Sequence, residues 1–140
     1  MNSIRAENLM VIRLDEGEEA ISSLKDIARD EQLRSAVILS FVGALKYSKL
    51  IVRKGVEKEI CLHAEAVGNG NISLLNGEPF IHLHVALGND DGSWVGHLLK
   101  GTVDIFCEVV LQIMPLEVRR VYDVDLAEKG VTVPFRLDLG

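Results

Sequence analysis

The sequence predicts a mainly β protein with one amphipathic helix, folded as a single domain. Apolar runs of strand length recur along the chain, and residues typical of turns separate several of them. Only one segment places its apolar residues at helical spacing. The length of 140 residues is typical of one domain, and a hydrophobic fraction of 48% is enough to form a core.

The first strand and the helix are expected within the N-terminal 32 residues. Residues 8–14, NLMVIRL, place Met10, Ile12 and Leu14 on one side of a strand. Residues 15–32 follow with helical periodicity, and their acidic start suits the positive end of the helix dipole. The apolar positions of this helix are Ile21, Leu24, Ile27 and Ala28.

Further strands are predicted from apolar runs. Residues 35–45 form a continuous run that ends near Gly43, long enough for a strand buried on both faces. A separate strand is expected directly afterwards, over residues 46–54. Residues 102–114 and 131–139 complete the mainly β pattern.

A β-hairpin is expected over residues 72–87, around Asn76-Gly77. Asn-Gly between two apolar runs is a strong hairpin signal, because both positions of a type I′ turn require positive φ angles. Pro79 stands at the start of the second strand, where its missing N–H is tolerated.

The second strand of this hairpin carries two histidines on one face. Because side chains alternate along a strand, His82 and His84 share a face with Phe80 and Ala86. The opposite face is apolar, and we expect it to pack on the helix. Its residues are Ile81, Leu83, Val85 and Leu87.

The histidine spacing is compatible with a metal site. Side chains two residues apart on a strand can reach one ion, and His97 is the natural third ligand if the segment GNDDGS folds the chain back. Three imidazoles with one open position are typical of catalytic zinc. The spacing equally allows a pair of imidazoles on a half-solvated face that packs against a partner subunit.

Net charge and charge distribution limit nucleic-acid binding. A formal charge of −6 argues against a surface that attracts phosphate everywhere. One segment, residues 46–58, is nevertheless basic, and it is interpreted either as a lysine-protected edge strand or as a phosphate-contacting surface. Its basic residues are Lys46, Lys49, Arg53, Lys54 and Lys58.

The sequence shows no long apolar span and no secretion signal, so we expect a cytoplasmic protein with no membrane partner. Two cysteines, Cys61 and Cys107, are too few and too widely spaced for a disulfide framework or a paired-cysteine zinc site. We expect both to be small buried side chains.

The segment from Gly70 to Leu111 resembles the plant and prokaryote conserved domain, the PPC domain, in its stand-alone prokaryotic type. The residues that carry the resemblance are GNIS, NGEPFIHLHVALGNDDG, GHLLKGTV and CEVVL, in this order. The resemblance implies an α+β fold, in which one main helix packs on an antiparallel-dominated β-sheet and three chains form a homotrimer. It also implies that His82, His84 and His97 form a cluster that holds a divalent metal, with zinc expected.

Prokaryotic members of this family are described as DNA-binding proteins, largely by analogy with plant proteins in which an AT-hook precedes the domain. This chain contains no Arg-Gly-Arg-Pro core of an AT-hook, the element that enters the minor groove. DNA is therefore expected to be a weak and non-specific partner.

Three functions remain open at this point. The favoured one is a trimeric binding or regulatory module that associates with DNA through a partner or through residues 46–58. The alternatives are a zinc-dependent enzyme acting on a small molecule, with Glu65 or Glu108 transferring protons, and a small-molecule sensor with an inter-subunit pocket. No nucleophile motif, phosphate-binding loop or dinucleotide fingerprint strengthens the enzyme hypothesis. His63 and Glu65 are local features of this chain, because the segment that contains them departs from the family's signature.

Overall fold

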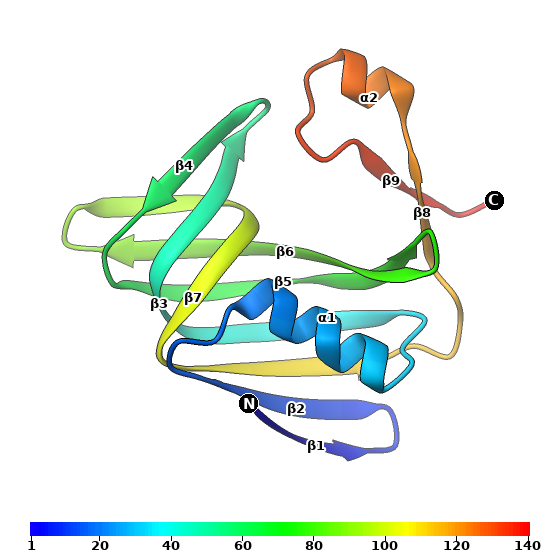
Figure 1. Cartoon of the computed structure of the whole chain (residues 1–140), viewed down its shortest axis with the longest axis horizontal. Helices are drawn as coiled ribbons and strands as arrows, with labels where there is room; N and C mark the ends of the chain where they lie inside the picture. Colours follow the sequence, from blue (N-terminus) through cyan, green and yellow to red (C-terminus); the bar gives the residue numbers. More distant parts are fainter.

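A computed structural model describes residues 1–140 as one extended, twisted β-sheet with two helices (Figure 1). The elements in chain order are β1 (Asn2–Ala6), β2 (Leu9–Asp15), α1 (Ala20–Asp30), β3 (Ala36–Arg53), β4 (Val56–Ile60), β5 (Ala64–Leu75), β6 (Glu78–Asn89), β7 (Gly92–Ile113), β8 (Arg119–Tyr122), α2 (Val124–Glu128) and β9 (Phe135–Asp138). Neither helix has the length and apolar character needed to cross a membrane.

The sheet is mixed but almost entirely antiparallel. Its main path runs β1-β2-β7-β3-β5-β8-β9, with β4 paired to β3 and with β6 paired to both β5 and β7. Only the contact between β5 and β8 is parallel. The expected antiparallel-dominated sheet with few helices is therefore confirmed.

Two strands are longer than the sequence predicted. The separate strands expected over residues 35–45 and 46–54 are one continuous strand, β3, which passes through Gly43. Strand β7 begins at Gly92 rather than near residue 102. Register shifts between β3 and β7 allow both strands to bend without ending, although the apolar runs from which the strands were predicted stop near these positions.

The hairpin predicted around Asn76-Gly77 is confirmed. Both residues have positive φ angles, 52° and 79°, as a type I′ turn requires. Strands β5 and β6 pair in unbroken register from this turn, beginning at Leu75 and Glu78.

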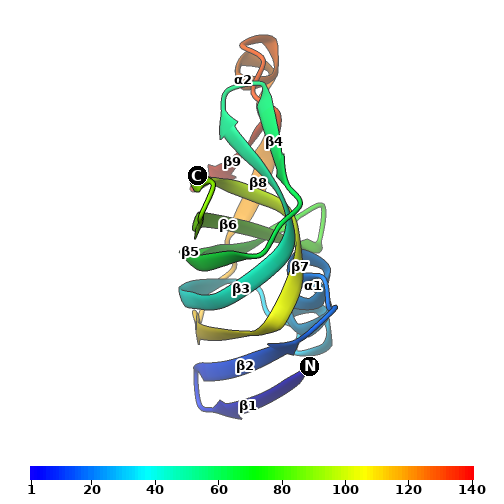
Figure 2. The same ribbon diagram turned by 90° about the vertical axis from the view of Figure 1, so that its left-hand side faces the viewer.

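The core lies between α1 and one face of the sheet. Helix α1 packs on β6 and β7, and its N-cap is Glu19, whose side chain accepts hydrogen bonds from the amides of Ile21 and Ser22. Figure 2 shows α1 against one side of the sheet, while no helix covers the opposite side at that level. The predicted inward face of β6 is confirmed, because all four of its residues are at most 4% exposed. These are Ile81, Leu83, Val85 and Leu87.

The C-terminal part differs most from expectation. The strand predicted over residues 131–139 is reduced to β9, and helix α2 was not predicted. Its five residues are too few to show an amphipathic period. Residues 119–138, which we call the C-terminal arm, form the last two strands of the sheet and extend away from its other strands (Figure 1). Cys107 is buried as expected, but Cys61 is exposed, because it lies in the short connection between β4 and β5.

Candidate metal centre

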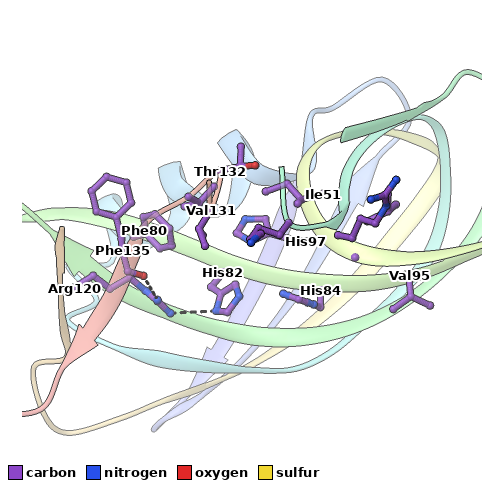
Figure 3. A pocket seen from close by; sticks show the side chains of 15 residues that line it. Ile51, Phe80, His82, His84, Val95, His97, Arg120, Val131, Thr132 and Phe135 are labelled. Atoms are coloured by element: carbon purple, nitrogen blue, oxygen red, sulfur yellow. Dashed lines mark hydrogen bonds between the residues drawn. The ribbon is translucent and has the colours of Figure 1, made fainter. Parts of the chain in front are cut away.

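The structure brings His82, His84 and His97 together. Strands β6 and β7 form an antiparallel hairpin in which His84 lies directly opposite His97. One nitrogen of each ring lies within 4.8 Å of the other two, and the ring centroids are 5.0 to 5.6 Å apart. Figure 3 shows the three imidazoles gathered on one side of the sheet. The arrangement predicted from the spacing is present.

Local backbone features bring His97 into this cluster. The turn at Asp90-Asp91 reverses the chain, and pairing resumes between Asn89 and Gly92. Gly96 then passes so close to β3 that a Cβ atom there would collide with the carbonyl oxygen of Ile51. A glycine at this position therefore lets β7 run between β6 and β3 and present His97 beside His84.

The histidines line a cavity of about 480 Å³. One wall is the end of β3, residues 51–54, and another belongs to the C-terminal arm. The arm contributes Arg120, Val131, Thr132, Val133 and Phe135 (Figure 3). The remaining lining residues are Phe80, Val95 and Gly96.

Arg120 is the main site residue that sequence reasoning missed. Its side chain is only 8% exposed in total, and its guanidinium lies 4.9 Å above the centre of the Phe80 ring. It donates hydrogen bonds to Ser73 Oγ, Phe135 O, Asn71 Oδ1 and His82 Nδ1 at 2.9 to 3.1 Å. The three side-chain acceptors are 38 to 49 residues away in sequence, so no local motif could reveal them.

The contact between Arg120 and His82 fixes the proton position on that histidine. A guanidinium can only donate, so His82 Nδ1 must be the acceptor, at 3.1 Å. In a neutral imidazole the proton then resides on Nε2. Neither nitrogen has a free lone pair in this state, and His82 can become a metal ligand only when the Arg120 contact is released.

Burial keeps His82 and His97 neutral. Burial, together with the positive charge of Arg120, lowers the pKa of His82 to about 4. Burial also lowers the pKa of His97 to about 4, with smaller contributions from the neighbouring histidines. Neutral imidazole is the form that binds metals. His97 thus suits a divalent ion as it stands, and His82 suits it once Arg120 releases the ring.

His63 lies in a different environment. Its Nδ1 is 2.7 Å from an Asp104 carboxylate oxygen and its Nε2 is 3.1 Å from Glu65 Oε2. The hydrogen bond with Asp104 is the largest cause that raises the pKa of His63. Neither Glu65 nor Glu108, the expected proton-transfer groups, lines the histidine cavity.

The five basic residues of segment 46–58 are dispersed. Lys49 forms an ion pair with Glu57 at 3.2 Å, whereas Arg53 and Lys54 line the histidine cavity. Lys46 is exposed on β3 and Lys58 is exposed on β4. The edge strand is β4, whereas residues 46–53 lie between β7 and β4, so the edge-strand interpretation applies only to Lys58.

Comparison with known families adds a decisive observation. Residues 1–115 match the family described as the Plants and Prokaryotes Conserved (PCC) domain, also abbreviated PPC. The chain belongs to this family. The resemblance seen in the sequence is thereby confirmed for a PCC domain that occupies most of the chain.

Solved structures share the whole fold of this PCC domain. A PPC protein from Pyrococcus horikoshii is 29% identical with a TM-score of 0.73, covering 99% of this chain and 96% of its own. A metal-containing protein from Archaeoglobus fulgidus is 27% identical with a TM-score of 0.78, covering 91% and 92%. A protein from Bacteroides thetaiotaomicron, provisionally named as DNA-binding, is 23% identical with a TM-score of 0.86, covering 98% and 96%. The search of curated proteins gave no significant match.

Proposed function

We propose that this PCC domain is a zinc-dependent binding module, in which His82, His84 and His97 hold the metal inside the cavity. The observation that carries the proposal is the convergence of one nitrogen from each histidine within 4.8 Å. The metal-containing relative from Archaeoglobus fulgidus, 27% identical, supports it. Borderline-soft zinc suits imidazole ligands, although other divalent ions of the first transition row compete for such a set.

Binding is favoured over catalysis by the composition of the cavity. Zinc held by three imidazoles keeps a position open for an external ligand and can polarise that ligand. A hydrolytic enzyme would also need a group that accepts or donates a proton near the reacting atoms. No carboxylate lines the cavity, so an incoming ligand would meet the metal, apolar walls and cationic side chains.

Metal analysis of purified variants tests this function. Wild-type protein incubated with zinc at neutral pH and then desalted should retain one zinc per chain. His84→Ala should lose it, because one of three ligands is gone, whereas Cys107→Ser should keep it, since this cysteine lies outside the cavity. Zinc-free wild-type protein, or full zinc retention by His84→Ala, would refute the site.

A homotrimer is the second part of the proposal. Cross-strand pairing places Val42, Val67, Ala86 and Val95 in one row on the face that carries His84. Three of them are 47 to 63% exposed. Nearby, Ile105 and Phe106 are also exposed, and Ile105 has a φ of 66°, which is unusual for a β-branched residue.

Such a continuous apolar surface is more typical of a subunit interface than of a surface facing water. Light scattering at micromolar concentration should give three times the 15.4-kDa mass of the chain. A mass of one chain would exclude the trimer.

DNA association is a second candidate function, supported by the provisional DNA-binding names of the structures from Bacteroides thetaiotaomicron and Ralstonia eutropha. Exposed Lys46 and Lys58 could contact phosphate, but Lys49 is paired with Glu57 and the chain carries a net charge of −6. We therefore expect weak, non-specific binding that weakens as salt rises. Gel shifts with random duplex DNA at two salt concentrations would reveal a tight, salt-resistant complex if this expectation is wrong.

A further inference from the structure

The histidine cavity has a charge opposite to that of the whole chain. The sequence contains 21 acidic and 15 basic residues, yet no aspartate or glutamate is among the 15 residues that line the cavity. Its charged side chains are Arg53, Lys54 and Arg120. A cationic, partly enclosed site attracts anions more strongly than the same charges would on an open surface.

Arg120 carries a buried charge without a counter-ion. All its hydrogen-bond acceptors are neutral: a hydroxyl, an amide, a backbone carbonyl and an imidazole. Other arginines of this chain do pair with carboxylates, including Arg119, the preceding residue, with Glu117. A buried guanidinium that is hydrogen-bonded but not neutralised is electrostatically incomplete, and an anion in the adjacent cavity would supply the missing charge.

Arg53 and Lys54 add positive charge to the cavity from the opposite wall. They lie at the end of β3, and Ile51 of the same strand pairs directly with His97. Both side chains are exposed, and neither forms an ion pair within the chain. Their charges are therefore available to a ligand that reaches the histidines.

The rest of the cavity is apolar. Phe80 and Phe135 contact edge to face, with ring centroids 6.1 Å apart, and Val131 and Val133 extend the same wall. A volume of about 480 Å³ is in the range of sites for small molecules. The cavity thus offers an apolar wall for the body of a ligand and positive charge for its head.

We propose that the cavity binds a small organic oxyanion, a carboxylate or a phosphate ester with an apolar body. The anionic head interacts with Arg53, Lys54, Arg120 and the metal, while the body packs against Phe80 and Phe135. This inference deepens the proposed zinc module by naming its ligand class, and its zinc-bound form rests on that function. The cationic side chains themselves belong to the chain whether or not metal is present.

Calorimetric titration with simple aromatic probes tests the proposal. Benzoate and phenyl phosphate distinguish the two kinds of head group, and benzamide presents the same ring without charge. Zinc-loaded protein should bind at least one of the two anions about tenfold or more tightly than benzamide. The double variant Arg53→Ala/Lys54→Ala should lose about tenfold in affinity for that anion.

A matched control removes the same charge elsewhere. Lys25→Ala/Lys100→Ala deletes two exposed lysines that do not line the cavity, and it should bind the anion as wild type does. Equal binding of benzamide and the anions, or equal losses in both double variants, would overturn the inference. It would also be overturned if duplex DNA, but neither small anion, bound in a manner dependent on Arg53 and Lys54.

Repeating the titration on metal-free protein separates the two proposals. Zinc retention without any preference for an anion overturns the ligand class and leaves the metal function standing. An anion preference that depends on Arg53 and Lys54 in a protein that cannot retain zinc supports the ligand class and overturns the metal function.

Discussion

The histidine cluster and His63 show how the same side chain is adapted to two opposite tasks. In the cluster, burial near the uncompensated charge of Arg120 lowers the pKa values of His82 and His97 to about 4. His63 is exposed, and hydrogen bonds to Asp104 and Glu65 raise its pKa. His82 and His97 are therefore neutral near pH 7, the form in which imidazole can bind a metal, whereas His63 is set to hold a proton between two carboxylates.

The two environments shift the histidine pKa in opposite directions because of their neighbouring side chains, not because of the strands that carry them. Both environments stand on the same sheet, and β5 and β6 pair along the whole distance between them. Near the cluster the neighbouring polar groups are donors or neutral amides, such as Asn71. Near His63 they are carboxylates. Histidine content alone does not distinguish the four histidines as metal ligands. Their neighbouring groups do, because carboxylates favour the protonated form and buried, cationic surroundings favour the neutral form.

The largest effect on stability should come from the residue beneath the cluster. Leu83 lies between His82 and His84 with its side chain fully buried, so Leu83→Ala should reduce the free energy of unfolding by about 2 to 5 kcal/mol. Leu62, next to His63, is 60% exposed, and Leu62→Ala should change the free energy of unfolding by about 0.5 kcal/mol or less. Urea denaturation compares them, and similar losses would contradict the different anchoring of the two regions.

The second-largest effect should be on metal affinity, after removal of Arg120, whose hydrogen bond competes with a metal for His82. Arg120→Met eliminates the donor to Nδ1 and a positive charge near the metal, so zinc should bind about tenfold more tightly, in line with about 1.5 kcal/mol for a charged hydrogen bond. Competition with a chelator measures the affinity, and circular dichroism checks the fold. Arg119→Met, at the exposed neighbour, serves as the control. Unchanged or weaker zinc binding by Arg120→Met would show that Arg120 does not restrain His82.

The smallest effect should be the pH dependence of metal-free protein. His82 and His97 bind protons more weakly in the folded state than in the unfolded chain, where the pKa is about 6.5. The unfolded state therefore takes up more protons between pH 6.5 and about 4, and stability should fall as pH is lowered through this window. His63 acts in the opposite direction: its raised pKa stabilises the fold below pH 6.5, and this contribution disappears as pH rises through the folded-state pKa.

Unfolding free energies measured at several pH values, for wild type and His63→Gln, separate the two contributions. The variant should keep the loss of stability that the cluster causes in acid and should lack the His63 contribution, which in wild type is present below pH 6.5 and disappears at higher pH. A wild-type curve that rose steadily toward pH 4 would contradict the neutral state of the cluster.

Much of the site could be predicted from sequence because its histidines belong to one hairpin. His82, His84 and His97 lie within sixteen residues, and alternation together with an Asp-Asp-Gly turn is enough to place them on one face. The core around α1 could also be predicted, because its apolar residues recur at regular helical and strand spacing. Arg120 could not be predicted, because it lies in the C-terminal arm and its side-chain acceptors are 38 to 49 residues away in sequence.

The continuous strands β3 and β7 were also hidden by their irregularities. The predicted ends followed the apolar runs, which stop near Gly43 and begin again at residue 102, whereas bulges let β3 and β7 continue through these points. Exposure of Cys61 depended on the path of one connection, which has no periodic signal.

The loose attachment of the C-terminal arm has a kinetic consequence. Strand β8 pairs with β5 at a single register position and α2 has no buried residue, so Arg120 supplies most of the arm's side-chain hydrogen bonds to β5 and β6. With so few contacts the arm should open more often than the core unfolds. Each opening carries Arg120 away from His82. Metal uptake should then be gated: its rate should rise with zinc concentration only until it equals the rate of arm opening, and remain at that plateau however much zinc is supplied.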